Sequence, residues 1–279
     1  MSITTPCIEI ERSIQKKFRK SIWRPFITGI KRYSLIKEGD RIACCISGGK
    51  DSMLLAKLMQ FLHKYSDVPF DLEFIVMDPG FNEINRQKII SNADLIGIPI
   101  KIFESDIFKV VSKTDRCPCY LCARMRRGYL YSFAKELSCN KIALGHHFSD
   151  VVETILMNML YGYKIQCMMP KLKSQNYPGI ELIRPMYCVH EDAITAWKRY
   201  NNLNFISCGC PLSENCNIFD ASADATTRQK VKSILKELKK DNKDVENSIF
   251  ESVHRINLHT VPSYTQNGQE HNFLDDYDL

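Results

Sequence analysis

A short run of small and charged residues, Ser-Gly-Gly-Lys-Asp-Ser at 47–52, could bind phosphate. Its two glycines let the backbone turn tightly and approach an anion, and a helix that starts there would aim unpaired N–H groups at it. Lys50 adds a full positive charge, and the serines add hydroxyl donors. We therefore predict a phosphate site made by Ser47, Gly48, Gly49, Lys50, Asp51 and Ser52.

The spacing of this loop separates it from two common phosphate motifs. The P-loop of kinase-like NTPases needs Gly-x-x-x-x-Gly-Lys-Ser/Thr, whereas here the glycines directly precede Lys50 and Asp51 follows it. The loop is not Gly-x-Gly-x-x-Gly either. A carboxylate beside phosphates suits a Mg²⁺ ligand, so we expect Asp51 to hold Mg²⁺ or to position the loop.

Twelve cysteines among 279 residues point to a second chemistry. The first twenty residues lack an apolar signal core, and no apolar run is long enough for a membrane span, so we expect a cytoplasmic protein with no membrane partner. Disulfide frameworks are rare in that compartment. Clustered cysteines then predict metal or redox chemistry.

The cysteines form two groups. Cys119 and Cys122 precede a basic helix in a Cys-x-x-Cys pair, with Cys117 as a near neighbour. The second group follows about ninety residues later and contains Cys208, Cys210 and Cys216. Thiolates without nearby histidines favour an iron–sulfur cluster or a four-cysteine zinc site, and a Cys-x-x-Cys pair also suits a redox dithiol.

Alternating strands and helices must position these residues. We predict strands over 41–46, 70–77, 99–103, 141–144 and 180–183, and helices over 52–63, 82–95, 124–137, 150–160 and 191–200. This alternation predicts a doubly wound α/β fold, with a mainly parallel sheet and helices on both faces. Ligands of such sheets bind at the carboxyl ends of the strands, and the phosphate loop follows the first strand there.

The two ends of the chain differ from this core. Residues 8–33 predict one basic amphipathic helix, 171–179 an exposed loop, 224–240 a charged helix, and the residues after Pro262 a mobile tail. We therefore divide the chain into a basic helical segment (1–35), a core domain that carries the chemistry (36–220), and a C-terminal helix with an acidic tail (221–279).

Three motifs in this order, SGGKDS, CYLCARMRRG and KIALGHHFSDVVETILMNMLYG, resemble the tRNA 2-thiocytidine synthetase family. Its members are adenine nucleotide α-hydrolase-like enzymes with the PP-loop of N-type ATP pyrophosphatases, and the related tRNA 2-thiouridine synthetases share the plan. The resemblance implies an ATP-dependent enzyme that adenylates the C2 oxygen of an anticodon-loop pyrimidine, cytidine first and uridine as the alternative. Sulfur then replaces that oxygen.

The resemblance also implies a [4Fe-4S] cluster held by three cysteines. Cys119 and Cys122 keep the family's spacing before Arg-x-x-Arg-Gly. The later loop departs from the family, because Cys208-Gly-Cys210-Pro stands where Cys-x-x-Cys is usual. We assign Cys210 as the third ligand, since the thiouridine relatives place Pro directly after theirs, and Cys208 stays the alternative.

On the ATP side, the resemblance places Gly145 and His146 beside the nucleotide, with Asp150 as a Mg²⁺ partner or an acid/base. A helix cap by Ser149 or Asp150 is the alternative. Asp78 ends a strand where superfamily members seat the adenine or ribose, although an Asp-Pro-Gly turn explains it as well. The expected catalytic residues are Lys50, Asp51 and Asp150.

The expected partners follow from this chemistry. Basic side chains on 8–33, with Arg124, Arg126 and Arg127, would hold the phosphates of a tRNA anticodon stem-loop. The sulfur donor would be a cysteine desulfurase or free sulfide, and a homodimer is usual for the family. Three rivals are a cluster-free sulfurtransferase with Cys122 and Cys210 as a persulfide pair, another adenylating ligase, and a cluster-containing RNA-binding regulator without catalysis.

Overall fold

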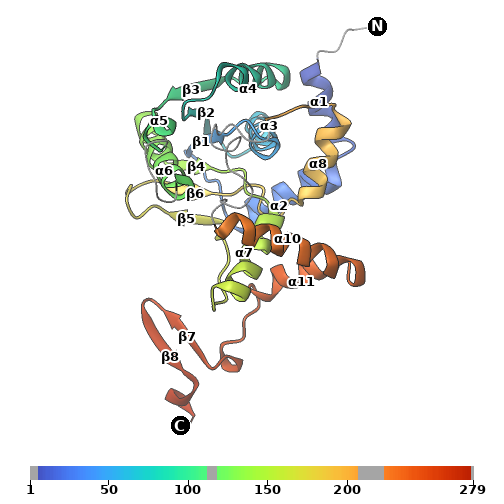
Figure 1. Cartoon of the computed structure of the whole chain (residues 1–279). Coiled ribbons are helices and arrows are strands. Elements are labelled where there is room, and N and C mark those ends of the chain that lie inside the picture. The colour runs from blue at the N-terminus through green and yellow to red at the C-terminus, as the bar shows by residue number, and fades with distance from the viewer. Residues whose placement is uncertain (1–5, 112–117, 207–222, 278–279) are drawn as a thin grey trace.

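A six-stranded sheet lies at the centre of the structure, a computed structural model that describes residues 6–111, 118–206 and 223–277 (Figure 1). In spatial order its strands are β3 (Ile100–Glu104), β2 (Asp71–Asp78), β1 (Arg41–Ile46), β4 (Lys141–Ala143), β6 (Glu181–Ile183) and β5 (Lys171–Lys173). All neighbours pair in parallel except β5, which runs antiparallel to β6 at one edge. The predicted mainly parallel sheet is confirmed.

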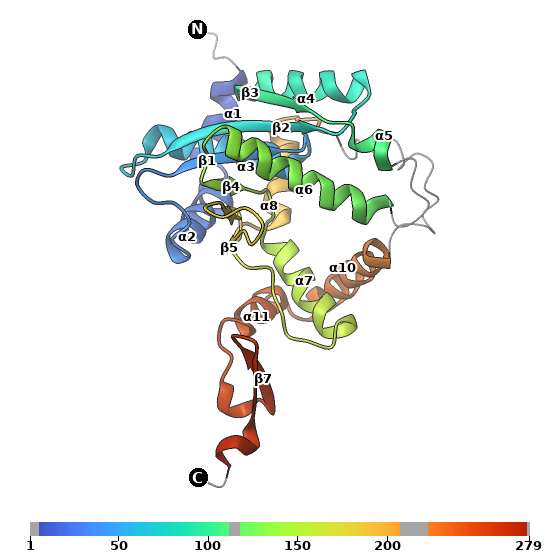
Figure 2. The ribbon, with the colours of Figure 1, turned by 90° about the vertical axis from the view of Figure 1, so that its left-hand side faces the viewer.

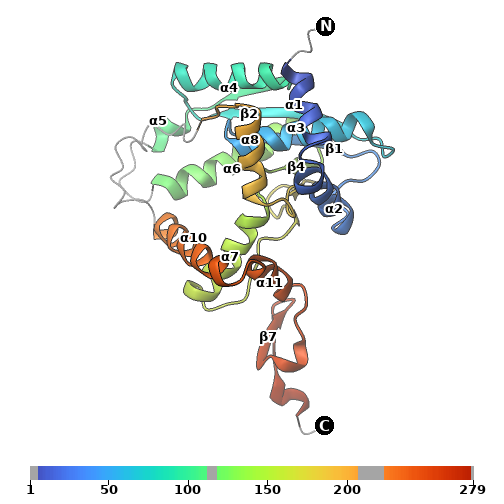
Figure 3. The same cartoon turned by 90° about the vertical axis from the view of Figure 1, so that its right-hand side faces the viewer.

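Side chains of β1 alternate between the two faces of the sheet. Ile42, Cys44 and Ile46 share a core with α3 (Lys50–Tyr65), α4 (Glu83–Ile96) and α8 (Glu191–Tyr200). Ala43 and Cys45 pack on the other side, with α6 (Pro118–Glu136). Helices therefore cover both faces, as predicted, and Cys44 and Cys45 are buried strand residues (Figures 2 and 3).

The N-terminal segment is not one helix. It comprises α1 (Pro6–Gln15), a π-helical turn η1 (Arg19–Trp23) and α2 (Arg24–Arg32). Pro25 lies in the first turn of α2, where its missing N–H does no harm, but an uninterrupted helix would have needed that donor. The predicted apolar stripe does face the protein, because the side chains of Ile10, Ile14, Phe18, Ile22 and Phe26 are buried in the core shared with α3.

Below the sheet in the view of Figure 1, α7 (Phe148–Tyr161) packs against the C-terminal helices α10 (Ala223–Asp241) and α11 (Val245–Ser252). The last described part of the chain corrects the prediction of a mobile tail. It contains the short helical turns η2 (Leu258–Thr260) and η3 (Phe273–Asp276), and a hairpin of β7 (Ser263–Gln266) and β8 (Gln269–Asn272) that projects away from the sheet (Figure 1). Asn267 and Gly268 form its turn with positive φ, the Asn-Gly pattern that hairpins favour.

Three further predictions differ from the structure. Residues 171–173 form the edge strand β5 within the expected loop, and α5 (Ile107–Val111) and α11 had no predicted counterpart. The basic helix starts at Pro118, so Cys119 and Cys122 belong to the first two turns of α6 and not to a loop before it. Among the described helices, none is both long enough and apolar enough to cross a membrane.

Candidate active site

The Ser47–Ser52 loop joins the carboxyl end of β1 to the start of α3. Gly49 is the N-cap of α3, so Lys50, Asp51 and Ser52 form its first turn, where unpaired N–H groups face an approaching anion. Gly48 has φ +85°, and a Cβ there would lie 2.6 Å from Ile89 Cγ1 and 2.7 Å from Ile206 Cδ1. A glycine is therefore required both by the backbone and by the packing.

Two serines close this loop. The Ser47 N–H and Ser47 Oγ donate to Ser52 Oγ over 3.1 Å and 3.2 Å, and the Ser52 hydroxyl donates to the Gly49 carbonyl over 3.0 Å. The loop is thus fixed by its own side chains before any ligand binds.

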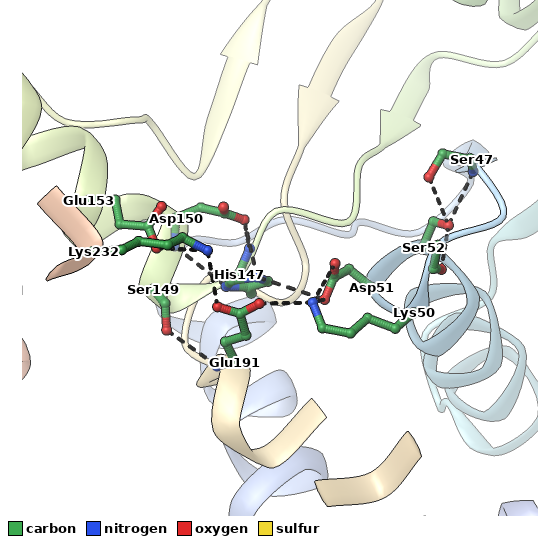
Figure 4. Close-up of polar contacts among 11 residues, drawn as sticks. Ser47, Lys50, Asp51, Ser52, His147, Ser149, Asp150, Glu153, Glu191 and Lys232 are labelled. Atoms are coloured by element: carbon green, nitrogen blue, oxygen red, sulfur yellow. Dashed lines mark hydrogen bonds and ion pairs between the residues drawn. The ribbon is translucent and has the colours of Figure 1, made fainter. Parts of the chain in front are cut away.

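Lys50 turns away from the loop toward two carboxylates (Figure 4). Its Nζ lies 3.0 Å from Asp51 Oδ1 and 2.9 Å from Glu191 Oε1. Burial alone would lower the pKa of Lys50, but the hydrogen bond to Glu191 and the charge of Asp51 outweigh it and raise that pKa. Lys50 is therefore a fully charged ammonium whose partners a phosphate group could replace.

Glu191 is shared between two lysines. Its Oε1 accepts from Lys50, and its Oε2 lies 3.4 Å from Lys232 Nζ on α10. Burial would raise the pKa of Glu191, but the hydrogen bond with Lys50, followed by the charges of Lys50 and Lys232, lowers it to about 2. The carboxylate stays ionised at every physiological pH.

The loop from β4 to α7 lies directly against the start of α3. A Cβ at Gly145 would be 3.1 Å from the Ser52 nitrogen, so the two backbones can meet only at a glycine. His147 and Asp150 cap α7 reciprocally, because the His147 N–H donates to Asp150 Oδ2 over 3.1 Å and the Asp150 N–H donates to His147 Nδ1 over 3.4 Å. The N-cap is therefore His147, which is neither Ser149 nor Asp150 of the alternative interpretation, and Asp150 is its partner at the third helical position.

A pocket of about 350 Å³ forms where these two loops meet. This volume lies in the range of small-molecule sites. Its polar lining comes from the two loops and from α6, and comprises Ser47, Asp51, Ser52, Gly145, His146, Asp150 and Arg126. Met77 and Leu130 are among its apolar walls. Residues predicted from the sequence in both loops therefore line the same pocket.

His146 lies in this pocket as a neutral imidazole. Burial first, and then the charge of Arg184, lower the pKa of His146 to about 4. Among the described residues, neither the Nδ1 of His146 nor the Nε of Arg184 has a hydrogen-bond partner, and both atoms are buried. An unpaired buried polar atom costs free energy, so a ligand in the pocket that bonds His146 Nδ1 would recover part of that cost.

Asp78 does not line this pocket. Its Oδ1 accepts the N–H groups of Gly80, over 2.8 Å, and Phe81, over 2.6 Å, which is the Asp-Pro-Gly turn of the alternative interpretation. It lies instead in a neighbouring pocket of about 300 Å³, beside Arg86 and Glu104. Asp78 therefore lines a different pocket from the phosphate loop, although its neighbour Met77 lines the pocket of that loop.

Only one of the two predicted groups of cysteines, the pair on α6, lies within the described residues. Cys122 is half-buried near Met77, and the residue one helical turn later, Arg126, reaches the pocket. Cys208 and Cys210 lie outside the described residues, as does Cys117. Within the described ranges no three His, Cys, Asp or Glu side chains are grouped to hold a metal ion. A cluster site would need a thiolate from the segment after Ile206, and Ile206 itself packs on Gly48.

Sequence reasoning missed three residues of this site: Glu153, Glu191 and Lys232. His147 belongs to the 145–150 loop that was expected beside the nucleotide. His147 Nε2 lies 3.7 Å from Asp51 Oδ1, and Glu153, which is 2% exposed, lies 3.5 Å from Lys232 Nζ. Glu191 resembles an ordinary acid in the first turn of a helix, and Lys232 one of many lysines on α10. Only the pairing of distant helices reveals them.

The predicted RNA-binding groups are divided between two parts of the molecule. Arg126 lines the pocket, whereas α2 lies at the end of the sheet opposite α5 (Figures 2 and 3). Contacts of the N-terminal segment with RNA remain a prediction.

Comparison with known proteins supplies relatives of this chain. The PP-loop domain family matches residues 10–209. The tRNA-cytidine(32) 2-sulfurtransferase of Paracidovorax citrulli is 34% identical over 95% of this chain and 81% of its own length. That of Syntrophotalea carbinolica is 34% identical over 86% and 89%. The U34-tRNA thiolase NcsA from Methanococcus maripaludis, solved with its [4Fe-4S] cluster, has the same fold, with a TM-score of 0.65 over 87% of this chain and 80% of its own, at 21% identity.

Proposed function

This chain belongs to the tRNA-cytidine(32) 2-sulfurtransferase family of PP-loop proteins, and from that premise we propose that it is an ATP-dependent tRNA sulfurtransferase that converts an anticodon-loop cytidine to 2-thiocytidine. The C2 oxygen of the base attacks the α phosphate of ATP, and the bond to the β phosphate breaks. Pyrophosphate leaves, and a sulfur nucleophile then attacks C2 and releases AMP with the former base oxygen. Uridine at the same site is the alternative substrate.

The chain's own residues bind the triphosphate. The first turn of α3, with the hydroxyls of Ser47 and Ser52, faces the departing pyrophosphate. Lys50 leaves Glu191 and neutralises the charge of the pyrophosphate. Gly48 and Gly49 allow the close approach of the backbone. Asp51 and Asp150, which line one pocket, would share a Mg²⁺ ion with the phosphates.

A [4Fe-4S] cluster fits the donors of this chain. Positions 119 and 122 fall within the first two turns of α6, and a spacing of three residues puts two positions on the same side of a helix. In the sequence, Cys210 follows four residues after Ile206, which packs on Gly48 of the phosphate loop. Bound there, the cluster would supply the sulfur for the base; Cys208 is the alternative third ligand.

The base would enter the pocket beside His146 and Asp150. A nucleotide of the anticodon loop can be turned out at less cost than a paired one. Asp78, in its separate pocket at the end of β2, would contact the adenosine part of ATP. Arg126, together with Arg124 and Arg127 on the same helix, would hold RNA phosphates near the pocket.

Exposed apolar side chains on α7, on the loop after it and near the C-terminal hairpin support a homodimer. They gather at the end of α7, on the loop after it and on the segment that carries the hairpin: Met159, Leu160, Tyr161, Tyr163, Ile165, Ile256, Leu258, Phe273, Leu274 and Tyr277. Exposed apolar side chains that form a contiguous patch are typical of an interface. The mass of the full chain in solution, measured by light scattering, should be that of two copies; a monomer at micromolar concentration would contradict this.

The single observation that carries the function is the shared pocket: Asp51 of the phosphate loop and Arg126 of the cysteine helix line the same cavity. The test is anaerobic incubation of the iron-loaded protein with tRNA, ATP, Mg²⁺ and sulfide, followed by mass spectrometry of the nucleosides. We expect 2-thiocytidine and pyrophosphate from the wild type and from the exposed-site control Lys243→Met, and neither from Lys50→Met. A product of 2-thiouridine would identify the alternative substrate, and a colourless protein active with a persulfide would contradict the cluster. Replacing sulfide by a cysteine desulfurase and cysteine tests the other donor.

A further inference from the structure

The C-terminal helix α10 reaches the phosphate loop through a chain of ion pairs (Figure 4). Lys232 Nζ lies 3.4 Å from Glu191 Oε2, whose other oxygen holds Lys50, and 3.5 Å from Glu153 Oε1 on α7. Acidic and basic side chains from α3, α7, α8 and α10 therefore alternate over five residues when Asp51 is included.

The place of Lys232 is fixed by packing. Its neighbours on α10, Val231 and Leu235, are buried against Phe148, Val151 and Val152 of α7. Arg228, one turn before Lys232, lies 3.4 Å from Glu153 Oε2. Because Arg228 also serves Glu153, Lys232 can move toward Glu191 without leaving the buried carboxylate unpaired.

Binding of ATP creates a need for such a movement. The three N–H donors of Lys50 are already taken by the two oxygens of Asp51 and by Glu191, so a phosphate must displace one of these carboxylates. Glu191 is half-buried and needs a counter-charge if it is the one displaced. The cation that already contacts its second oxygen is Lys232.

We propose that Lys232 is a positioning residue of the ATP site, which takes Glu191 from Lys50 when the phosphates arrive. This rests on the proposed function, since it assumes that ATP binds at the phosphate loop. Without Lys232, Glu191 would hold Lys50 more strongly and phosphate would compete less well for it.

The test is a double-mutant cycle on the full, iron-loaded protein, with the dissociation constant of a non-cleavable α,β-methylene ATP measured by calorimetry. We expect Lys232→Met to weaken binding about tenfold and Lys236→Met, on the same helix and exposed, to leave it unchanged. Glu191→Gln should bind at least as well as the wild type, because Lys50 is then released. The pair Glu191→Gln/Lys232→Met should bind like Glu191→Gln, since a neutral amide needs no counter-ion. Lys232→Arg should restore binding.

If Lys232 only stabilised the fold, adding Glu191→Gln to Lys232→Met would not recover the binding of the ATP analogue. If Lys232→Met binds like the wild type, or if the double variant stays tenfold weaker than Glu191→Gln, the inference is wrong. Thermal unfolding of each variant shows whether it folds, and Lys232→Arg keeps the charge should Lys232→Met be unstable. The proposed function fails separately, and this inference with it, if the wild type does not bind the analogue or if Lys50→Met binds it equally well.

Discussion

The Lys50 ammonium lies 2.9 Å from Glu191 Oε1 although the two residues are 141 positions apart in the chain. Each begins its helix, Lys50 in α3 and Glu191 in α8, so the contact joins the amino ends of two helices that cover the same face of the sheet. Both ends carry partial positive charge, which favours an anion between them. Glu191 supplies that anion until a phosphate replaces it, and phosphate affinity is therefore set by a competition within the protein.

Replacing Gly48 should damage the phosphate loop more than the backbone alone would suggest. Gly48→Ala places a Cβ within 3.0 Å of Ile89 and Ile206 at φ +85°, whereas Gly179 has φ +87° with nothing within 4 Å of its Cβ position. We expect Gly179→Ala to lower the free energy of unfolding by about 1 kcal/mol and Gly48→Ala by roughly a further 1–3 kcal/mol. Urea unfolding measures both, and binding of the ATP analogue should be lost only in Gly48→Ala. Equal costs would contradict the packing argument.

The cysteine helix gives a second prediction. Cys122→Ser should remove most of the bound iron and labile sulfide together with the brown absorbance, while Cys167→Ser, a partly buried thiol beside Met169, should retain them. Comparing Cys208→Ser with Cys210→Ser assigns the third ligand, and we expect the loss in Cys210→Ser. Full iron content in Cys122→Ser would rule out this residue as a ligand.

The sheet could be predicted from the sequence because its signals are local. The apolar run at 41–46 between polar flanks, and the glycines at 48 and 49 after it, specify a strand, a loop and a helix start without any distant contact. The family resemblance placed the loop at 145–150 beside the nucleotide bound by the loop at 47–52. The structure brings the two loops together because they follow the neighbouring parallel strands β4 and β1.

What could not be predicted depends on pairing across the chain. Glu191 and Lys232 have no motif, and their roles follow only from α8 and α10 meeting Lys50 and Glu153. The hairpin of β7 and β8 had a local signal in Asn267-Gly268, but its polar strands lack the apolar alternation that marks a half-buried sheet. Pro25 in turn divided a helix whose apolar spacing had predicted continuity.

Glu153 predicts a pH dependence of stability. Burial raises the pKa of Glu153 to about 7 from an ordinary 4.5, against the opposing charges of Lys232 and Arg228. Between these values the folded state holds a proton that the unfolded state has lost, so the free energy of unfolding falls as the pH rises. Glu153→Gln cannot ionise and should remove a slope of up to about 1.4 kcal/mol per pH unit between pH 5.5 and 7. Urea unfolding at several pH values measures this, with the exposed Glu136→Gln as the control; parallel curves for Glu153→Gln and wild type would contradict it.

The last prediction concerns the attachment of the N-terminal segment. Lys57 of α3 is 1% exposed, and its Nζ lies 3.3 Å from Glu11 Oε2 on α1 and 2.9 Å from Gln60 Oε1. Removing Glu11 leaves a buried ammonium without its counter-charge, so Glu11→Ala should cost about 3 kcal/mol of unfolding free energy. Lys64, which is 61% exposed and lies 3.8 Å from the other Glu11 oxygen, is the matched control, and Lys64→Met should cost less than about 1 kcal/mol.

Lys57→Met separates loss of the ion pair from loss of the buried charge. A methionine fills much of the same space without needing a partner, and Glu11 can still reach Lys64, so this variant should be more stable than Glu11→Ala. Urea unfolding of the three variants gives the order of stability directly. If Glu11→Ala and Lys64→Met are equally stable, the Glu11–Lys57 ion pair does not contribute to stability. The N-terminal segment would then be attached by its apolar stripe alone.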